Sequence, residues 1–84
     1  MKTTEYFLRN MREPDRVWIK PEWIERVLNN PEWENEQQDG RFQRRSRISE
    51  ANNRVLRVVV LSDGETVHNA FFDRTFKPPK TEEL

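Results

Sequence analysis

The most informative part of the sequence is Arg54-Val-Leu-Arg-Val-Val-Val-Leu-Ser-Asp-Gly-Glu-Thr-Val-His-Asn-Ala-Phe-Phe-Asp-Arg74. Its two runs of β-branched and aromatic residues flank the pair Asp63-Gly64. A type I′ turn needs positive φ at both central residues, and an Asp-Gly pair between such runs therefore predicts a β-hairpin. The hairpin also contains the only histidine of the chain, His68.

A two-residue turn at Asp63-Gly64 predicts which residues of this hairpin face each other. Val59 then lies opposite His68. Arg57 lies opposite Ala70, which makes Arg57 and His68 diagonal neighbours on one face of the sheet. The other face is mostly apolar, and we expect helices to pack on it. That face carries Leu56, Val58, Val60, Val67 and Phe71, with Asn69 among them, and Val55 on the opposite side pairs with Phe72.

A second hairpin is predicted upstream, because Asp39-Gly40 separates residues 33–37 from residues 41–48. The turn-rich link 50–53 then leads into the central strand at 54–61. A four-residue link places Arg44 and Ser46 on the face of Arg57 and His68. A bulge there places Arg45 and Arg47 on that face instead.

Two helices precede the strands. Thr3 or Thr4 can cap a short first helix that ends before Pro14. A second helix begins at Pro21 and ends at Asn29-Asn30-Pro31. The sequence therefore predicts an α+β fold, with two N-terminal helices packed on one face of a roughly four-stranded antiparallel meander. We expect a single domain over residues 1–76 and a flexible tail over residues 77–84.

Composition narrows the classes of function. The 84 residues contain no cysteine, which excludes disulfides, cysteine metal sites and thiol catalysis. One histidine, and acids whose spacing matches no metal-binding loop, predict no metal or other cofactor. No apolar stretch is long enough to cross a membrane, and none resembles a signal peptide. We therefore expect a soluble, cytoplasmic protein without a membrane partner.

The net charge of zero hides two blocks of opposite charge. Residues 22–39 carry six acids and one arginine, whereas residues 41–57 carry six arginines and one acid. The planar guanidinium of arginine suits bidentate binding of phosphate. The candidate phosphate-binding residues are Arg41, Arg44, Arg45, Arg47 and Arg74. The alternative interpretation is a solvated strand face that the neighbouring acids neutralise.

The candidate catalytic residues are His68 and Arg57. Histidine has a pKa near neutrality and can act as an acid or a base in RNA cleavage. Arg57 and Arg44 can bind the phosphate that is attacked. The alternatives are a half-exposed strand histidine without chemistry and an Arg57 ion pair with Glu34 or Glu36. Tyr6 can stack a base or act as an acid, but its spacing favours a packing residue. The tryptophans Trp18, Trp23 and Trp33 can be stacking platforms, but in so small a domain they are interpreted as mostly core.

Residues 11–74 resemble the RelE/BrnT-like toxin superfamily of small bacterial proteins. The resemblance is one of pattern, and lies in Met11-Arg12, Arg16-Val-Trp-Ile19, Trp23-Ile-Glu-Arg-Val-Leu-Asn-Asn-Pro31, Asp39-Gly-Arg41, Arg54-Val-Leu-Arg-Val-Val-Val60 and Ala70-Phe-Phe-Asp-Arg74. It implies a metal-independent endoribonuclease that acts on messenger RNA and is inhibited by a cognate antitoxin. It also implies RNA-binding positions at Arg44 or Arg45, Arg57, His68 and Arg74.

Two functions follow as expectations. The first is an RNA-binding toxin with endoribonuclease activity. The second is a non-catalytic protein-interaction module of the same fold, which the zero net charge favours because ribosome-dependent toxins of this superfamily are usually strongly basic. A homodimer formed through an edge strand is compatible with either.

Overall fold

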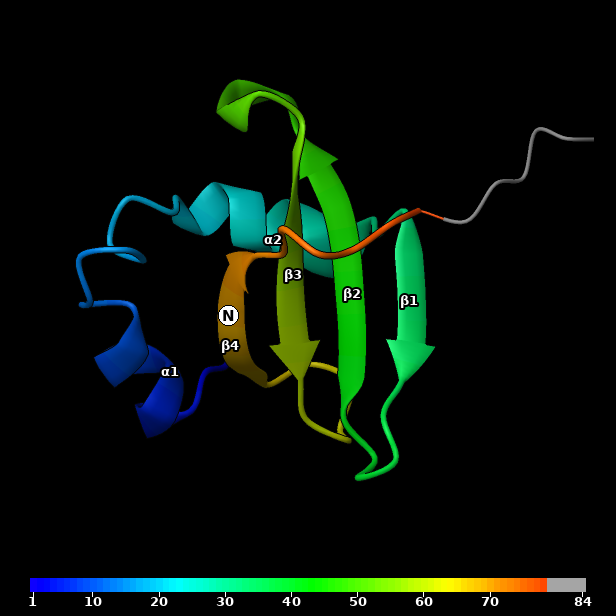
Figure 1. Cartoon of the computed structure of the whole chain (residues 1–84). Helices are drawn as coiled ribbons and strands as arrows, with labels where there is room; N and C mark the ends of the chain where they lie inside the picture. The colour runs from blue at the N-terminus through cyan, green and yellow to red at the C-terminus, as the bar shows by residue number, and fades with distance from the viewer. Residues whose placement is uncertain (79–84) are drawn as a thin grey trace, which may run out of the picture.

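The computed structural model describes residues 1–78 (Figure 1). Its elements are α1 (Glu5–Asn10), α2 (Pro21–Asn29), β1 (Trp33–Glu36), β2 (Phe42–Ile48), the short 3₁₀ helix η1 (Ser49–Ala51), β3 (Arg54–Val60) and β4 (Val67–Phe72). The strands form one antiparallel sheet in the order β1-β2-β3-β4. The predicted α+β class with two N-terminal helices and a four-stranded meander is confirmed. Of the predicted tail, residues 79–84 lie outside the described residues.

Helix α2 lies across one face of the sheet, against β2 and β3 (Figure 1). Its first residue, Pro21, suits the start of a helix because its missing N–H would have no partner there. Trp23, Ile24 and Val27 form its buried stripe. They pack in one core with the apolar residues that the strands turn toward α2, namely Ile48, Leu56, Val58, Val60, Val67 and Ala70.

Helix α1 lies beside β4, at one edge of the sheet (Figure 1). Of the two predicted caps, Thr4 is the one used, and its Oγ1 accepts a hydrogen bond from Phe7 N at 3.0 Å. The chain before α1 pairs with β4, since Thr4 N donates to Val67 O and Val67 N donates to Lys2 O. Phe7 is buried in the core, whereas Tyr6 reaches the other side of the sheet.

The β3–β4 hairpin has a longer loop and a different register from those predicted. Leu61 N donates to Thr66 O, and Asp63 accepts from Glu65 N and Thr66 N, so four residues lie outside the ladder. A β-bulge between Val59 and Val60 leaves His68 without a cross-strand partner.

The predicted pairs of this hairpin are therefore wrong. Arg57 lies opposite Phe71, Val59 opposite Asn69 and Leu56 opposite Phe72. Phe71 and Asn69 consequently lie on the face away from α2, and Ala70 replaces them in the core. We call the face away from α2 the open face. Its strand residues include Gln43, Arg45, Arg47, Val55, Arg57, Val59, Asn69 and Phe71.

The link between β2 and β3 decides which arginines reach the open face. Ile48 pairs with Arg54, so the link has five residues and not four. It contains η1 followed by Asn52 and Asn53, both with left-handed φ values of 60° and 59°. Arg45 consequently lies directly opposite Arg57. The prediction that Arg44 and Ser46 share the face of Arg57 is wrong, and Arg45 and Arg47 occupy it without a bulge in that link.

Candidate anion-binding site on the open face

A hollow of about 260 Å³ lies where the open face meets α1 and the loop between β1 and β2. It brings together Arg57 from β3, His68 from β4 and Arg41 from the loop, three of the residues selected from the sequence. The other lining residues are Tyr6, Gln37, Val59, Asn69 and Phe71. None of the lining residues is acidic. Arg41 Nε lies 3.9 Å from Asp39 Oδ2 in an exposed, weak ion pair, so most of the positive charge that suits the hollow to an anion remains.

His68 is held in place from α1. Its Nδ1 lies 3.0 Å from Thr4 Oγ1, and its ring stacks on Tyr6 with 4.6 Å between ring centroids. The Thr4 hydroxyl can donate to Nδ1 or accept from it, because accepting from Phe7 N still leaves its own proton and a second lone pair. In either arrangement Nδ1 is engaged, and Nε2 is the ring nitrogen available to a ligand.

The pKa of His68 is lowered from its ordinary value of 6.5. Burial is the larger cause, and the positive charge of Arg41 is the second. Both effects disfavour the imidazolium, so His68 is mainly neutral at pH 7 and able to accept a proton.

Arg57 is only partly satisfied by the described residues. Its Nη1 lies 3.6 Å from Asp73 Oδ2, and its guanidinium lies over the Phe71 ring at 5.1 Å. Its Nε is buried with no hydrogen-bond partner among the described residues, and the same holds for Gln37 Oε1 on the lining of the hollow. Burial lowers the pKa of Arg57, and the charge of Arg45 lowers it further.

Asp73 is the carboxylate that faces these two cross-strand arginines. Arg45 Nε donates to Asp73 Oδ2 at 3.2 Å, and the Asp73 side chain is 7 % exposed. Burial raises the pKa of Asp73, but hydrogen bonds from Arg45 and Thr75 outweigh it, so the pKa is lowered. The sequence suggested Glu34 or Glu36 as the partner of Arg57, and the structure shows Asp73 instead. One carboxylate between two guanidiniums leaves a positive charge beside the hollow.

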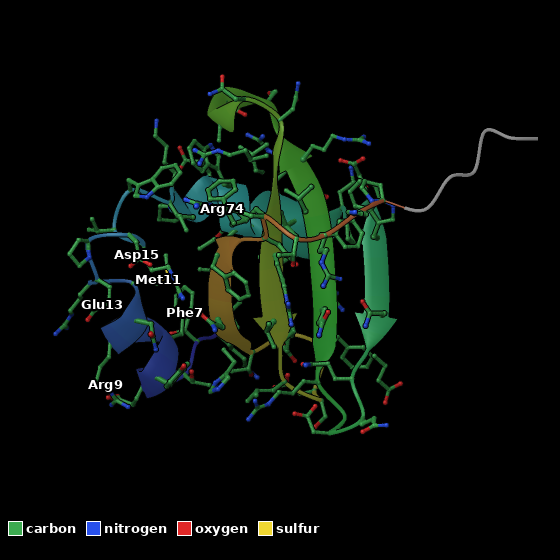
Figure 2. All side chains as sticks on the ribbon, in the orientation of Figure 1. Phe7, Arg9, Met11, Glu13, Asp15 and Arg74 are labelled. Carbon is green, nitrogen blue, oxygen red and sulfur yellow. The ribbon has the colours of Figure 1, made fainter. Side chains whose placement is uncertain are left out.

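The other predicted arginines lie elsewhere. Arg44 faces the α2 side, where it pairs with Glu34 at 2.5 Å and donates to Leu28 O. Arg47 pairs with Glu32 at 2.9 Å and lies over the Trp33 ring. Arg74 follows β4 at its far end and lines a different hollow (Figure 2). Of the five predicted phosphate-binding residues, Arg41 alone lines the hollow with Arg57 and His68.

Several residues of the site were not selected from the sequence. Tyr6 was interpreted as a packing residue, yet it stacks on His68 and lines the hollow. Asn69 and Phe71 reach it only because the bulge turns them to the open face. Asp73 is not near its two arginine partners in the chain, which are 16 and 28 residues away.

Comparison of the chain with protein-family profiles, with characterised proteins and with solved structures gave no match. No helix within residues 1–78 is long and apolar enough to cross a membrane. In the same residues, no three histidine, aspartate or glutamate side chains gather as a possible metal site. The chemical role of the hollow is therefore inferred from the side chains that line it.

Proposed function

We propose that this protein binds RNA in the hollow of Arg41, Arg57 and His68 and cleaves it as a metal-independent endoribonuclease. The observation that carries the proposal is the convergence of two arginines and a neutral histidine in a hollow without an acidic lining residue. The resemblance of residues 11–74 to RelE/BrnT-like toxins supports the same activity.

Phosphate binding follows from the charge of the site. Arg57 lines the hollow with a side chain that is 23 % exposed, so an anion in the hollow lies beside its guanidinium. Asp73 neutralises only one of the pair Arg45 and Arg57. A phosphodiester beside Arg57 and Arg41 supplies the missing negative charge and the acceptor oxygens.

The cleavage step uses the 2′-hydroxyl of the RNA as nucleophile. His68 Nε2 removes its proton while the 2′-oxygen forms a bond to phosphorus and the bond from phosphorus to the 5′-oxygen breaks. Arg57 and Arg41 stabilise the charge on the phosphate oxygens in the transition state. Tyr6 has the only hydroxyl among the lining residues and donates a proton to the leaving 5′-oxygen. The products are a 2′,3′-cyclic phosphate and a 5′-hydroxyl.

The proposed setting is the cytoplasm of a bacterium, where a cognate antitoxin keeps such an enzyme inactive. An antitoxin that covers the open face would block the hollow directly. An acidic segment fits this role, because the hollow is lined by arginines and no acid.

The test is cleavage of single-stranded RNA by purified protein in the presence of a chelator. We expect His68→Gln and Arg57→Gln each to reduce the cleavage rate by roughly a hundredfold or more. Arg12→Gln is the matched control, since it removes an exposed arginine that does not line the hollow. The proposal fails if wild-type protein neither binds nor cleaves RNA, or if the two site variants cleave like wild type.

A second candidate is a non-catalytic protein-interaction module. It is favoured by the internal ion pairing of the basic strand, where Arg44, Arg45 and Arg47 each contact an acid of the same chain. This module would capture one protein in stoichiometric amount. Its binding would resist ribonuclease treatment and be lost in Arg47→Glu, while recovery of RNA alone would exclude it.

A further inference from the structure

A second hollow of about 280 Å³ lies between the loop that joins α1 to α2 and the far end of β4. Figure 2 labels Asp15 on that loop and Arg74 just after β4. Three arginines line this hollow, namely Arg16, Arg54 and Arg74, together with the aromatic residues Trp18, Phe71 and Phe72. Asp15 is its only acidic lining residue.

Trp18 is fixed in orientation and still accessible. Its ring stacks on Phe72 with 5.1 Å between centroids and an interplanar angle of 7°, and its Nε1 donates to Asp15 O at 3.0 Å. The residue nevertheless remains 41 % exposed. An indole that is held by its neighbours and reaches solvent is a ready platform for a nucleobase, because stacking on it needs little further ordering.

The arginines around Trp18 give the hollow a positive charge. The guanidinium of Arg54 lies over the Trp18 ring at 5.0 Å and over the Phe72 ring at 4.8 Å, and its Nε donates to Ala51 O. Arg74 is exposed. The single acid, Asp15, lies 3.7 Å from Arg16 and has a side chain that is 79 % exposed, so it offsets only one of the three cations. An anion that approaches Trp18 therefore meets Arg54 and Arg74.

The two hollows adjoin along β4. Phe71 lines both, with Arg57 over its ring at 5.1 Å and Arg16 at 5.3 Å. Arg16 also donates to Asn69 Oδ1, which belongs to the first hollow, at 2.9 Å. A strand longer than a dinucleotide that enters the first hollow can therefore extend past Phe71 into the second.

We propose that the second hollow is a subsite for the nucleotide beyond the two that flank the cleaved phosphodiester, and that the substrate is single-stranded RNA. A base stacks on Trp18, and Arg54 and Arg74 bind the backbone phosphate beside it. Bases within a duplex already stack on each other and are not free to do this. The inference rests on the proposed function, because it assigns the RNA strand that the first hollow cleaves.

The test measures binding of 2′-O-methyl oligonucleotides, which lack the attacking hydroxyl and stay intact. A dinucleotide fills only the first hollow, and a longer single strand fills both. We expect Trp18→Leu and Arg74→Gln each to weaken binding of the longer strand by roughly tenfold and to leave dinucleotide binding unchanged. Arg74→Gln also reduces by about one the slope of log affinity against log salt concentration. Arg12→Gln is the control that leaves both affinities unchanged.

The inference is overturned if the variants leave the ratio of the two affinities as in wild type, or if a duplex of the same sequence binds as tightly as the single strand. Arg74 is exposed, so its variant reports on binding even if Trp18→Leu perturbs the fold. Failure of the proposed function gives a different result from failure of the subsite. If the first hollow does not bind RNA, Arg57→Gln binds the dinucleotide as tightly as wild type.

Discussion

The two faces of the sheet are built from alternate residues of the same strands, yet they differ in how completely their groups are satisfied. On β3, Leu56 and Val58 turn toward α2 and are fully buried in an apolar core. Their neighbours in the strand, Val55 and Arg57, lie on the open face and are only partly buried. The α2 face excludes water and holds the elements together, whereas the open face carries partly exposed charged groups that can contact a ligand.

The open face also differs in how its charge is balanced. Asp73 is the carboxylate partner of both Arg45 and Arg57. Nearer to β1, the exposed Arg47 has a carboxylate partner of its own, Glu32. Charge is therefore balanced at the rim and in excess at the centre. The excess lies next to the hollow of His68, which is where an anion would be bound most tightly.

The largest effect should come from the α2 face. Leu56→Ala removes a fully buried side chain, and we expect it to lower the free energy of unfolding by about 3 kcal/mol. Val55→Ala, one residue away on the open face, should lower it by about 1 kcal/mol or less. Urea denaturation measures both. Equal losses would show that the two faces contribute alike to the fold.

The next effect should come from the carboxylate at the centre of the open face. Asp73→Asn leaves Arg45 and Arg57 without a counter-charge, and we expect a loss of about 2 kcal/mol. Glu34→Gln, which breaks the more exposed pair with Arg44, should cost about 0.5 kcal/mol. Inorganic phosphate should restore more of the melting temperature in Asp73→Asn than in Glu34→Gln. A similar phosphate effect in both variants would argue against an excess of charge at the centre.

Thr4 connects the start of α1 to the open face. Thr4→Val removes the hydroxyl that caps the helix and holds His68 Nδ1, and we expect a stability loss of about 1 kcal/mol. Thr4→Ser keeps the hydroxyl and should retain both stability and cleavage. The readout is the cleavage rate at a temperature where both variants are folded. If Thr4→Val cleaves like Thr4→Ser, the orientation of His68 does not depend on Thr4.

The smallest effect should be the pH dependence contributed by His68. Its pKa is lower in the folded protein than the ordinary 6.5, so the unfolded chain binds the proton more readily. Stability should therefore decrease as the pH falls below 6.5 toward the folded pKa, and the part due to His68 should be absent in His68→Gln. Cleavage should lose activity in the same direction, since a protonated His68 is no longer a base. Denaturation curves of the two proteins across this range provide the comparison.

The α2 face was predictable from the sequence, and the open face was predictable only in part. The core can be identified from the spacing of apolar residues, because that spacing differs between a helix and a strand. It is helical at Trp23, Ile24 and Val27, and β3 contains a nearly continuous apolar run. The position of His68 beside Arg57 was also anticipated, although the register that suggested it was wrong.

Two local irregularities explain what the sequence did not reveal. The bulge between Val59 and Val60 and the fifth residue in the β2–β3 link each shift the pairing by one residue, which exchanges the faces of the residues beyond them. Asn52 and Asn53 in left-handed conformations make that longer link possible. The bulge and the longer link depend on loop geometry, which the sequence pattern does not specify. Arg44 and Arg45 are chemically identical, so the sequence does not indicate which of them lies on the open face.

The N-terminal residues that pair with β4 have a consequence for self-association. Lys2 and Thr4 occupy the backbone groups of Val67, and Arg16 caps the carbonyl of Ala70, so that edge is partly covered within the described residues. Within residues 1–78, no strand pairs with the outer edge of β1. Two copies that joined through β1 would each use their free edge, and the assembly would close as a dimer without growing into a filament.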